Sequence, residues 1–193
     1  MGAAAVGKSS IISQFLYEQF IGEYKETIEE LHRSEYKLTD TQLELDILDT
    51  SGVHSFPAMR TLAISTSNAF ILVYSVDDPS SFDEVIALRE QILAERNDEN
   101  VPIVIVANKT DMESDERVIK REIAETLVSV EWGHGYVEAS AKENVNIEGI
   151  FKEILRQSKV KYSLSPVLER RRISIPVLTQ KKKDLSPKRH SID

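Results

Sequence analysis

Cysteine is absent from all 193 residues, which excludes disulfide bonds, thiolate metal sites and lipid attachment through a thiol within this sequence. Apolar runs are short as well. None approaches the roughly 18 residues of a membrane-spanning helix, so we expect no such helix. The basic stretch and long apolar run of a signal peptide are also missing from the start of the sequence. We therefore expect a cytoplasmic protein.

Positive charge is scarce except near the C-terminal end. Residues 161–193 contain nine Lys and Arg residues and three Asp and Glu residues, a net charge of +6. Because the whole chain has a net charge of −8, residues 1–160 have a net charge of −14. An acidic globule of this kind is not expected to bind nucleic acid. Residues 161–193 combine Pro, Ser and basic clusters, which predicts a disordered tail. This tail could contact anionic lipid at the inner plasma membrane, and Ser174, after three arginines, is a candidate kinase site.

The remaining composition, 41% hydrophobic and 29% charged, is enough for one globular domain, which we expect over residues 1–160. Two nearly unbroken apolar runs, residues 69–76 and 101–107, predict strands of a parallel sheet that is covered on both faces. Residues 34–48 alternate around a Thr-Asp pair and predict an antiparallel hairpin with one solvated face. Residues 136–140 predict a short last strand.

Helical patterns alternate with these strands. Residues 8–19 carry a helical apolar pattern, and Ser81 with Glu84 suggests a capping box ahead of a second helix. Asn146 is a candidate cap for the last helix. Two apolar stripes follow the helical period: Val118, Ile119, Ile123 and Leu127, and then Ile147, Ile150, Phe151, Ile154 and Leu155. Alternating strands and helices predict a doubly wound α/β sheet that binds ligands at the carboxyl ends of its strands.

The first eight residues after Met1, GAAAVGKS, match the phosphate-binding loop pattern G-x-x-x-x-G-K-S. In such a loop the backbone N–H groups surround phosphate oxygens, and the N-terminus of the following helix adds its dipole. Lys8 is expected to reach the outer phosphates, and the hydroxyl of Ser9 is expected to bind Mg²⁺. A small-residue turn that only precedes a helix is the alternative interpretation of the pattern alone.

Three further motifs come directly after predicted strands. Asp49 and Gly52, in LDTSG, are placed to hold Mg²⁺ through water and to donate an N–H to a terminal phosphate. Asp111, in NKTD, could accept two hydrogen bonds from guanine N1 and N2, a donor pair that adenine lacks. The segment 140–142, SAK, could present backbone N–H groups to guanine O6. Each motif alone is also a common turn.

Taken together in this order, the four motifs resemble those of the Ras superfamily of small GTPases over residues 1 to about 160, and the Ras branch fits best. The segments TIEELHR, DTSGVHSFPAMRTLAI and LSPVLERRRIS look most like the Rhes/Dexras subgroup, with Di-Ras and Rap as near relatives. The resemblance implies a three-layer P-loop NTPase fold. Its sheet would be mostly parallel with one antiparallel edge strand, and helices would cover both faces.

The resemblance also implies a monomeric guanine-nucleotide switch that binds GTP and GDP with Mg²⁺ and hydrolyses GTP. By this resemblance, Phe20 would stack edge-on against guanine, and Thr27 would bind Mg²⁺ and sense the γ-phosphate. Lys8, Thr27 and Gly52 would act in hydrolysis, while Ser9, Thr27 and Asp49 would hold the metal. The nucleotide-binding residues would be Gly2, Ala3, Ala4, Ala5, Val6, Gly7, Lys8, Ser9, Ser10, Phe20, Tyr24, Thr27, Asp49, Gly52, Asn108, Lys109, Asp111, Ser140, Ala141 and Lys142.

The sequence departs from the Ras pattern in several places. Val53 replaces the glutamine that orients the attacking water, and valine cannot hydrogen-bond a water, so we expect slow hydrolysis. Ala4 and Ala5 replace two loop glycines and would crowd an inserted arginine finger, and Glu26 replaces a proline in the first switch. The family's central first strand is missing ahead of Gly2. We therefore expect Met1 to be an internal methionine of a longer protein.

Two other functions compete with the switch. A GTP-locked or nucleotide-free interaction protein without useful turnover is favoured by Val53 and Ala4, and an ATP-using P-loop kinase is disfavoured by NKTD. For a switch, we expect effector proteins to read Tyr24–Leu31, together with an exchange factor and an activating protein. His54, Trp132 and His134 are expected to be packing or loop residues.

Overall fold

The structure is a computed structural model that describes residues 1–37, 42–52, 57–112 and 115–158. The chain runs α1 (Lys8–Tyr17), β1 (Glu29–Lys37), β2 (Gln42–Thr50), α2 (Pro57–Thr66), β3 (Phe70–Ser75), α3 (Pro79–Arg96), β4 (Ile103–Asn108), α4 (Arg121–Glu125), a π-helix (Thr126–Glu131), β5 (Gly135–Glu138) and α5 (Ile147–Gln157). This alternation of strands and helices is the predicted α/β arrangement. The predicted tail, with Ser174, lies outside the described residues.

The sheet has two hydrogen-bonded parts. β3, β4 and β5 pair in parallel in that order, and β1 pairs with β2 antiparallel, as the apolar runs and the alternating segment predict. Exposed Arg33 and Glu35 alternate with the half-buried Ser34 between them, so one face of the hairpin is solvated as expected. The predicted Thr-Asp turn lies outside the described residues.

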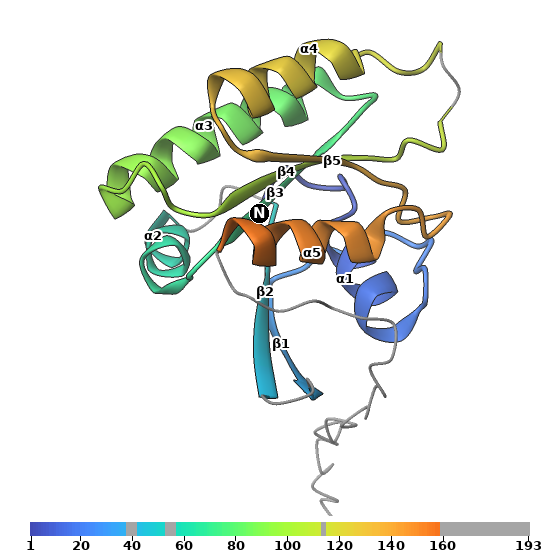
Figure 1. Cartoon of the computed structure of the whole chain (residues 1–193). Helices are drawn as coiled ribbons and strands as arrows, with labels where there is room; N and C mark the ends of the chain where they lie inside the picture. Colours follow the sequence, from blue (N-terminus) through green and yellow to red (C-terminus); the bar gives the residue numbers. More distant parts are fainter. Residues whose placement is uncertain (38–41, 53–56, 113–114, 159–193) are drawn as a thin grey trace, which may run out of the picture.

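Helices cover both faces of the parallel strands (Figure 1), with α1 and α5 on one side and α3 and α4 on the other. Val104 and Val106 of β4 pack in the core of α1 and α5, whereas Ile103 and Ile105 pack on the opposite face. Because successive side chains of a strand alternate between faces, an uninterrupted apolar run supplies both cores. The predicted stripe of α5 is confirmed, since all five of its residues are buried.

The described residues contain no strand ahead of α1 and no ladder between β2 and β3. Met1 lies at the free edge of β3 instead. Its amine donates to the carbonyl oxygen of Ile71 at 2.7 Å, and its carbonyl accepts from the N–H of Val73 at 2.9 Å. Burial and the nearby positive charge of Lys8 lower the pKa of this amine to about 5, although the negative charge of Asp49 acts in the opposite direction.

Two local expectations are wrong. The cap of α3 is Asp78, whose side chain accepts from the N–H of Ser80, and Pro79 begins the helix. Ser81 is instead buried inside the first turn, where it accepts a bond from the N–H of Ser75, so it is not an N-cap. A proline at the first helical position fixes the start three residues earlier than the expected capping box.

The stripe expected around residues 118–127 is the second error. Val118 precedes the helix, and the side chains of Val118 and Ile123 are exposed. The buried residues of this segment are Ala124 and Val128. The helix passes into a π-helix at Thr126, and the wider turn changes which residues share a face. The uniform 3.6-residue period thus selected two residues that pack partly buried against the core, Ile119 and Leu127, but missed the fully buried Ala124 and Val128.

Candidate functional site

Residues 2–7 form a tight loop that leads directly into α1, as the phosphate-loop pattern predicts. Gly2, Ala5 and Gly7 have positive φ angles of 136°, 59° and 95°. Gly7 is the N-cap of α1 and provides no side-chain cap, so the N–H groups of the first turn lack that partner. The N-terminus of α1 therefore offers both free donors and the positive end of a helix dipole, which suits an anion.

Gly7 has a packing role in addition to its left-handed backbone. A Cβ at this position would lie 2.3 Å from Nδ2 of Asn108, which is closer than any real Cβ contact. Nδ2 of Asn108 donates to the carbonyl of Val6 at 2.8 Å, so the loop is held against the end of β4. Only glycine allows this approach.

Lys8 is buried at the start of α1. Its Nζ donates to the carbonyl oxygen of Ala3 at 2.6 Å, so the side chain folds back over the loop. Burial lowers the pKa of Lys8, although the negative charges of Asp49 and Glu84 act in the opposite direction. A buried ammonium with little compensating charge is a favourable partner for a phosphate.

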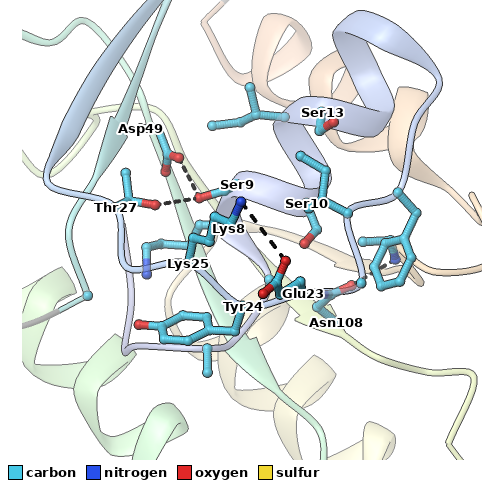
Figure 2. A pocket seen from close by; sticks show the side chains of 18 of the residues that line it. Lys8, Ser9, Ser10, Ser13, Glu23, Tyr24, Lys25, Thr27, Asp49 and Asn108 are labelled. Atoms are coloured by element: carbon cyan, nitrogen blue, oxygen red, sulfur yellow. Dashed lines mark hydrogen bonds and ion pairs between the residues drawn. The ribbon is translucent and has the colours of Figure 1, made fainter.

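Ser9 connects two distant segments next to this lysine (Figure 2). Its Oγ donates to Oδ2 of Asp49 at 2.5 Å and lies 2.8 Å from the hydroxyl of Thr27. The second carboxylate oxygen of Asp49, Oδ1, is buried and has no hydrogen-bond partner among the described residues. Two hydroxyls and an unpaired carboxylate oxygen at one point form a donor set that suits Mg²⁺, which takes oxygen ligands and keeps several waters.

The described residues contain no cluster of three or more His, Asp or Glu side chains that could hold a metal. Ser9, Thr27 and Asp49 would therefore hold Mg²⁺ only with help from water or from oxygens of a bound ligand, such as phosphate oxygens.

Asn108 ends β4, and Asp111 follows it, at the other end of the cavity. The N–H of Ala141 donates to Oδ1 of Asn108 at 3.1 Å, so one amide side chain joins this loop to the phosphate loop. Ser140 donates its hydroxyl to Oδ1 of Asp111 at 2.6 Å, and Nζ of Lys142 lies 3.5 Å from Oδ2. Burial opposes ionisation, but Ser140 and Lys142 outweigh it and lower the pKa of Asp111. The side chain is thus a fixed carboxylate.

Arg117 helps to hold the segment after Asp111 in place. Its guanidinium forms an ion pair with Glu138 at the end of β5, and its Nε donates to the carbonyl of Ile119 at 2.7 Å. Neither residue belongs to a motif, because nothing in their spacing indicates that the two segments meet.

The predicted site residues surround one cavity of about 810 Å³. Its lining includes sixteen of them: Ala4, Ala5, Gly7, Lys8, Ser9, Ser10, Phe20, Tyr24, Thr27, Asp49, Gly52, Asn108, Lys109, Asp111, Ala141 and Lys142. The other four, Gly2, Ala3, Val6 and Ser140, do not line it. Val53, whose identity bears most on hydrolysis, and His54 lie outside the described residues.

The cavity wall also contains residues that the motifs did not indicate. Most belong to the segment between α1 and β1, including Gln19, Ile21, Gly22 and Glu23, and Ser13 lies on α1. This segment is largely exposed, and the side chain of Ile28 is 81% exposed. Phe20 is 44% exposed at the edge of the cavity, where an aromatic face is free to receive a base.

Gly52 brings the end of β2 against the phosphate loop. A Cβ here would lie 2.5 Å from backbone atoms of Ala4, so the two backbones are in close contact. His134 and Trp132 lie elsewhere and pack around Arg89, which donates to Nε2 of His134 at 3.0 Å and stacks over the Trp132 ring at 4.6 Å. The structure thus places these two residues in packing, as expected.

No helix among the described residues is long and apolar enough to cross a membrane.

Comparisons with known proteins agree with this geometry. The sequence model of the Ras family matches residues 1–160. GTP-binding protein Rhes from Homo sapiens is 42% identical over 179 residues, an alignment that covers 89% of this chain and 67% of that protein. The Rhes proteins of Mus musculus and Rattus norvegicus are each 43% identical over 176 residues, covering 87% of this chain and 66% of the relative. The chain therefore spans about two thirds of the length of these relatives.

Proposed function

Because the chain belongs to the Ras family, we propose that it is a guanine-nucleotide-binding switch in signal transduction that holds GTP or GDP with Mg²⁺. The observation that carries this proposal is the single cavity where three groups of residues meet. The first group is the phosphate loop with Lys8, and the second is the set of side-chain oxygens of Ser9, Thr27 and Asp49. The third consists of Asn108, Asp111 and Ala141 at the opposite end of the cavity.

Each end of the cavity has a distinct role in this proposal. The free N–H groups at the start of α1 bind the phosphates, and Lys8 exchanges the Ala3 carbonyl for a phosphate oxygen. Mg²⁺ would supply charge neutralisation at the phosphates, and Ser9, Thr27 and, through water, Asp49 would hold it.

At the other end, ionised Asp111 accepts hydrogen bonds from guanine N1 and N2. The side chain of Asp111 is only 14% exposed, so this interaction is selective: adenine offers no donor pair there and would leave these two hydrogen bonds unmade. Phe20 provides an aromatic contact for the base.

Switching follows from the position of Thr27. Its hydroxyl is bonded to Ser9, while its neighbours in the segment Tyr24–Leu31 are mostly exposed. A γ-phosphate that engages Thr27 would order this segment, and its loss would release it. Effector proteins would then bind the ordered surface. We propose that an exchange factor and an activating protein act on the same region, on a monomeric cytoplasmic protein whose basic tail contacts anionic lipid.

Hydrolysis is the step that the sequence weakens. Val53 offers no hydrogen bond to an attacking water, so the proposed rate is low. Ala5, a residue with a Cβ in a left-handed conformation, stands where the family has glycine and adds bulk beside the phosphates. These two residues favour a second candidate function, a GTP-locked interaction protein without useful turnover.

One experiment tests both candidates. The chain is purified in Mg²⁺ and denatured, and the released nucleotide is identified by chromatography. GDP is expected if the chain hydrolyses GTP, and GTP is expected if it is locked. An adenine nucleotide, or no nucleotide even after incubation with excess GDP, would refute guanine-nucleotide binding.

A further inference from the structure

Gln14 is a polar residue in the buried part of α1. Its side chain is only 6% exposed, and its neighbours Ile11 and Phe15 belong to the core between α1 and α5. Burying an amide is unfavourable unless it is hydrogen-bonded, so this position needs a partner. Gln14 finds one 127 residues away, because its Nε2 donates to the carbonyl oxygen of Ala141 at 2.7 Å.

Ala141 is therefore held on both sides of its backbone. Its N–H donates to Oδ1 of Asn108, and its carbonyl accepts from Gln14. Ala141 is itself 3% exposed and lines the nucleotide cavity, whereas Gln14 does not reach that cavity and lines a separate one of about 460 Å³. Gln14 thus supports the cavity wall from behind.

These bonds close a ring through the site. Asn108 donates to Val6 in the phosphate loop, the loop continues into α1, and α1 carries Gln14 back to Ala141. The residue next to Ala141, Ser140, also donates to Asp111. A shift of the Ala141 carbonyl would therefore move the support of the base-recognition carboxylate and loosen the link to the phosphate loop.

We propose that Gln14 is a positioning residue for base recognition: it fixes the Ala141 carbonyl, keeps the Ser140–Lys142 segment in place and slows the release of guanine nucleotide. This inference rests on the proposed function. Without the donor of Gln14, the buried Ala141 carbonyl has to find water, and the segment moves away from the base to do so.

The test uses Gln14→Leu and Gln14→Met in the full chain. Both are close in size to glutamine and remove only the hydrogen-bonding group. Gln157→Leu is the matched control, since Gln157 lies on α5 away from the cavity and its amide donates to Glu153 at 3.0 Å. Release of a fluorescent GDP is measured after addition of excess unlabelled GDP, alongside its association rate, single-turnover GTP hydrolysis and thermal unfolding at saturating GDP.

The expected result is a release rate about threefold to tenfold faster in both Gln14 variants, the range expected for one hydrogen bond. Association, hydrolysis and the Gln157 control should stay within about twofold of the unmodified chain, while backbone hydrogen exchange of Ser140–Lys142 speeds up. A purely structural glutamine would not separate these measurements, because its loss would lower thermal stability without selectively speeding nucleotide release.

Three outcomes would overturn the inference. Unchanged release in both variants would show that the bond does not hold the base segment. Loss of folding in both would assign Gln14 a structural role alone. If the unmodified chain binds no guanine nucleotide, the proposed function itself fails and this inference falls with it. By contrast, normal binding with unchanged release refutes only the role of Gln14.

Discussion

Replacing Gly7 by alanine should disable the nucleotide site through a steric clash with Asn108, and a control substitution can separate this clash from backbone strain. Gly7 and Gly133 both have left-handed φ angles, of 95° and 69°. A Cβ on Gly7 would lie 2.3 Å from Nδ2 of Asn108, whereas a Cβ on Gly133 would meet nothing within 4 Å. Gly133→Ala is therefore a matched control that changes the backbone preference without the clash.

The magnitudes follow from these contacts. A left-handed alanine costs about 1–2 kcal/mol, and about 0.4–1 kcal/mol is regained through the less flexible unfolded chain. Gly133→Ala should therefore lower the free energy of unfolding by only about 0.5–1 kcal/mol. In Gly7→Ala the Asn108 amide must also move away from the Val6 carbonyl and the Ala141 N–H. Both groups are buried, and each unsatisfied group costs about 1–3 kcal/mol.

The additional loss of about 2–6 kcal/mol falls within the site, so we expect GDP affinity to drop about thirtyfold or more in Gly7→Ala. Gly133→Ala should bind GDP normally. Titration with a fluorescent GDP gives the affinities, and urea unfolding gives the stabilities. Equal effects of the two substitutions on GDP affinity would refute the argument, since backbone strain would then account for everything.

Three other substitutions test separate parts of the site and fold. Asp111→Asn should weaken GDP binding by about 10³-fold or more and favour a xanthine nucleotide, whose C2 carbonyl suits an amide donor. The control Asp83→Asn, at an exposed position, should leave GDP binding unchanged. Competition assays between the nucleotides measure both effects. Burial and the charge of Arg89 lower the pKa of His134 to about 4, so the unfolded chain takes up the proton first and stability should fall from pH 6.5 toward pH 4. His134→Gln should flatten that decline in urea midpoints, and a parallel decline in both proteins would contradict it. Val53→Gln should raise single-turnover GTP hydrolysis by about tenfold or more, and an unchanged rate would show that residue 53 does not limit the reaction.

Local patterns were sufficient for most of the architecture. The apolar runs at residues 69–76 and 101–107 correspond to β3 and β4, and the alternating residues 34–37 and 42–48 lie within β1 and β2. The hydrophobic pattern of each strand depends on which of its faces are buried, and this pattern can be recognised from consecutive residues alone. The pair Asp78-Pro79 is a strong signal for the start of α3. The prediction chose Ser81 instead, because Ser81 offers a competing cap signal three residues later.

Other features depended on contacts between distant segments. The π-helix at Thr126 is a small change in turn width that the sequence pattern does not reveal, and Ile123, just ahead of it, is exposed where the pattern predicted burial. The pairing of Arg117 with Glu138 joins the segment after β4 to the end of β5. No periodicity can report such a meeting, because each partner is only an ordinary surface residue in its own segment.

The sequence by itself determined the residue types of the site and their order along the chain, because phosphate, metal and base recognition each need particular groups at short spacings. The tertiary structure decided how those groups are held. It placed Asn108 between Val6 and Ala141, Ser9 between Thr27 and Asp49, and Gln14 behind the base segment. These bonds close over up to 127 residues, and only the packing of helices on the sheet brings their partners within reach.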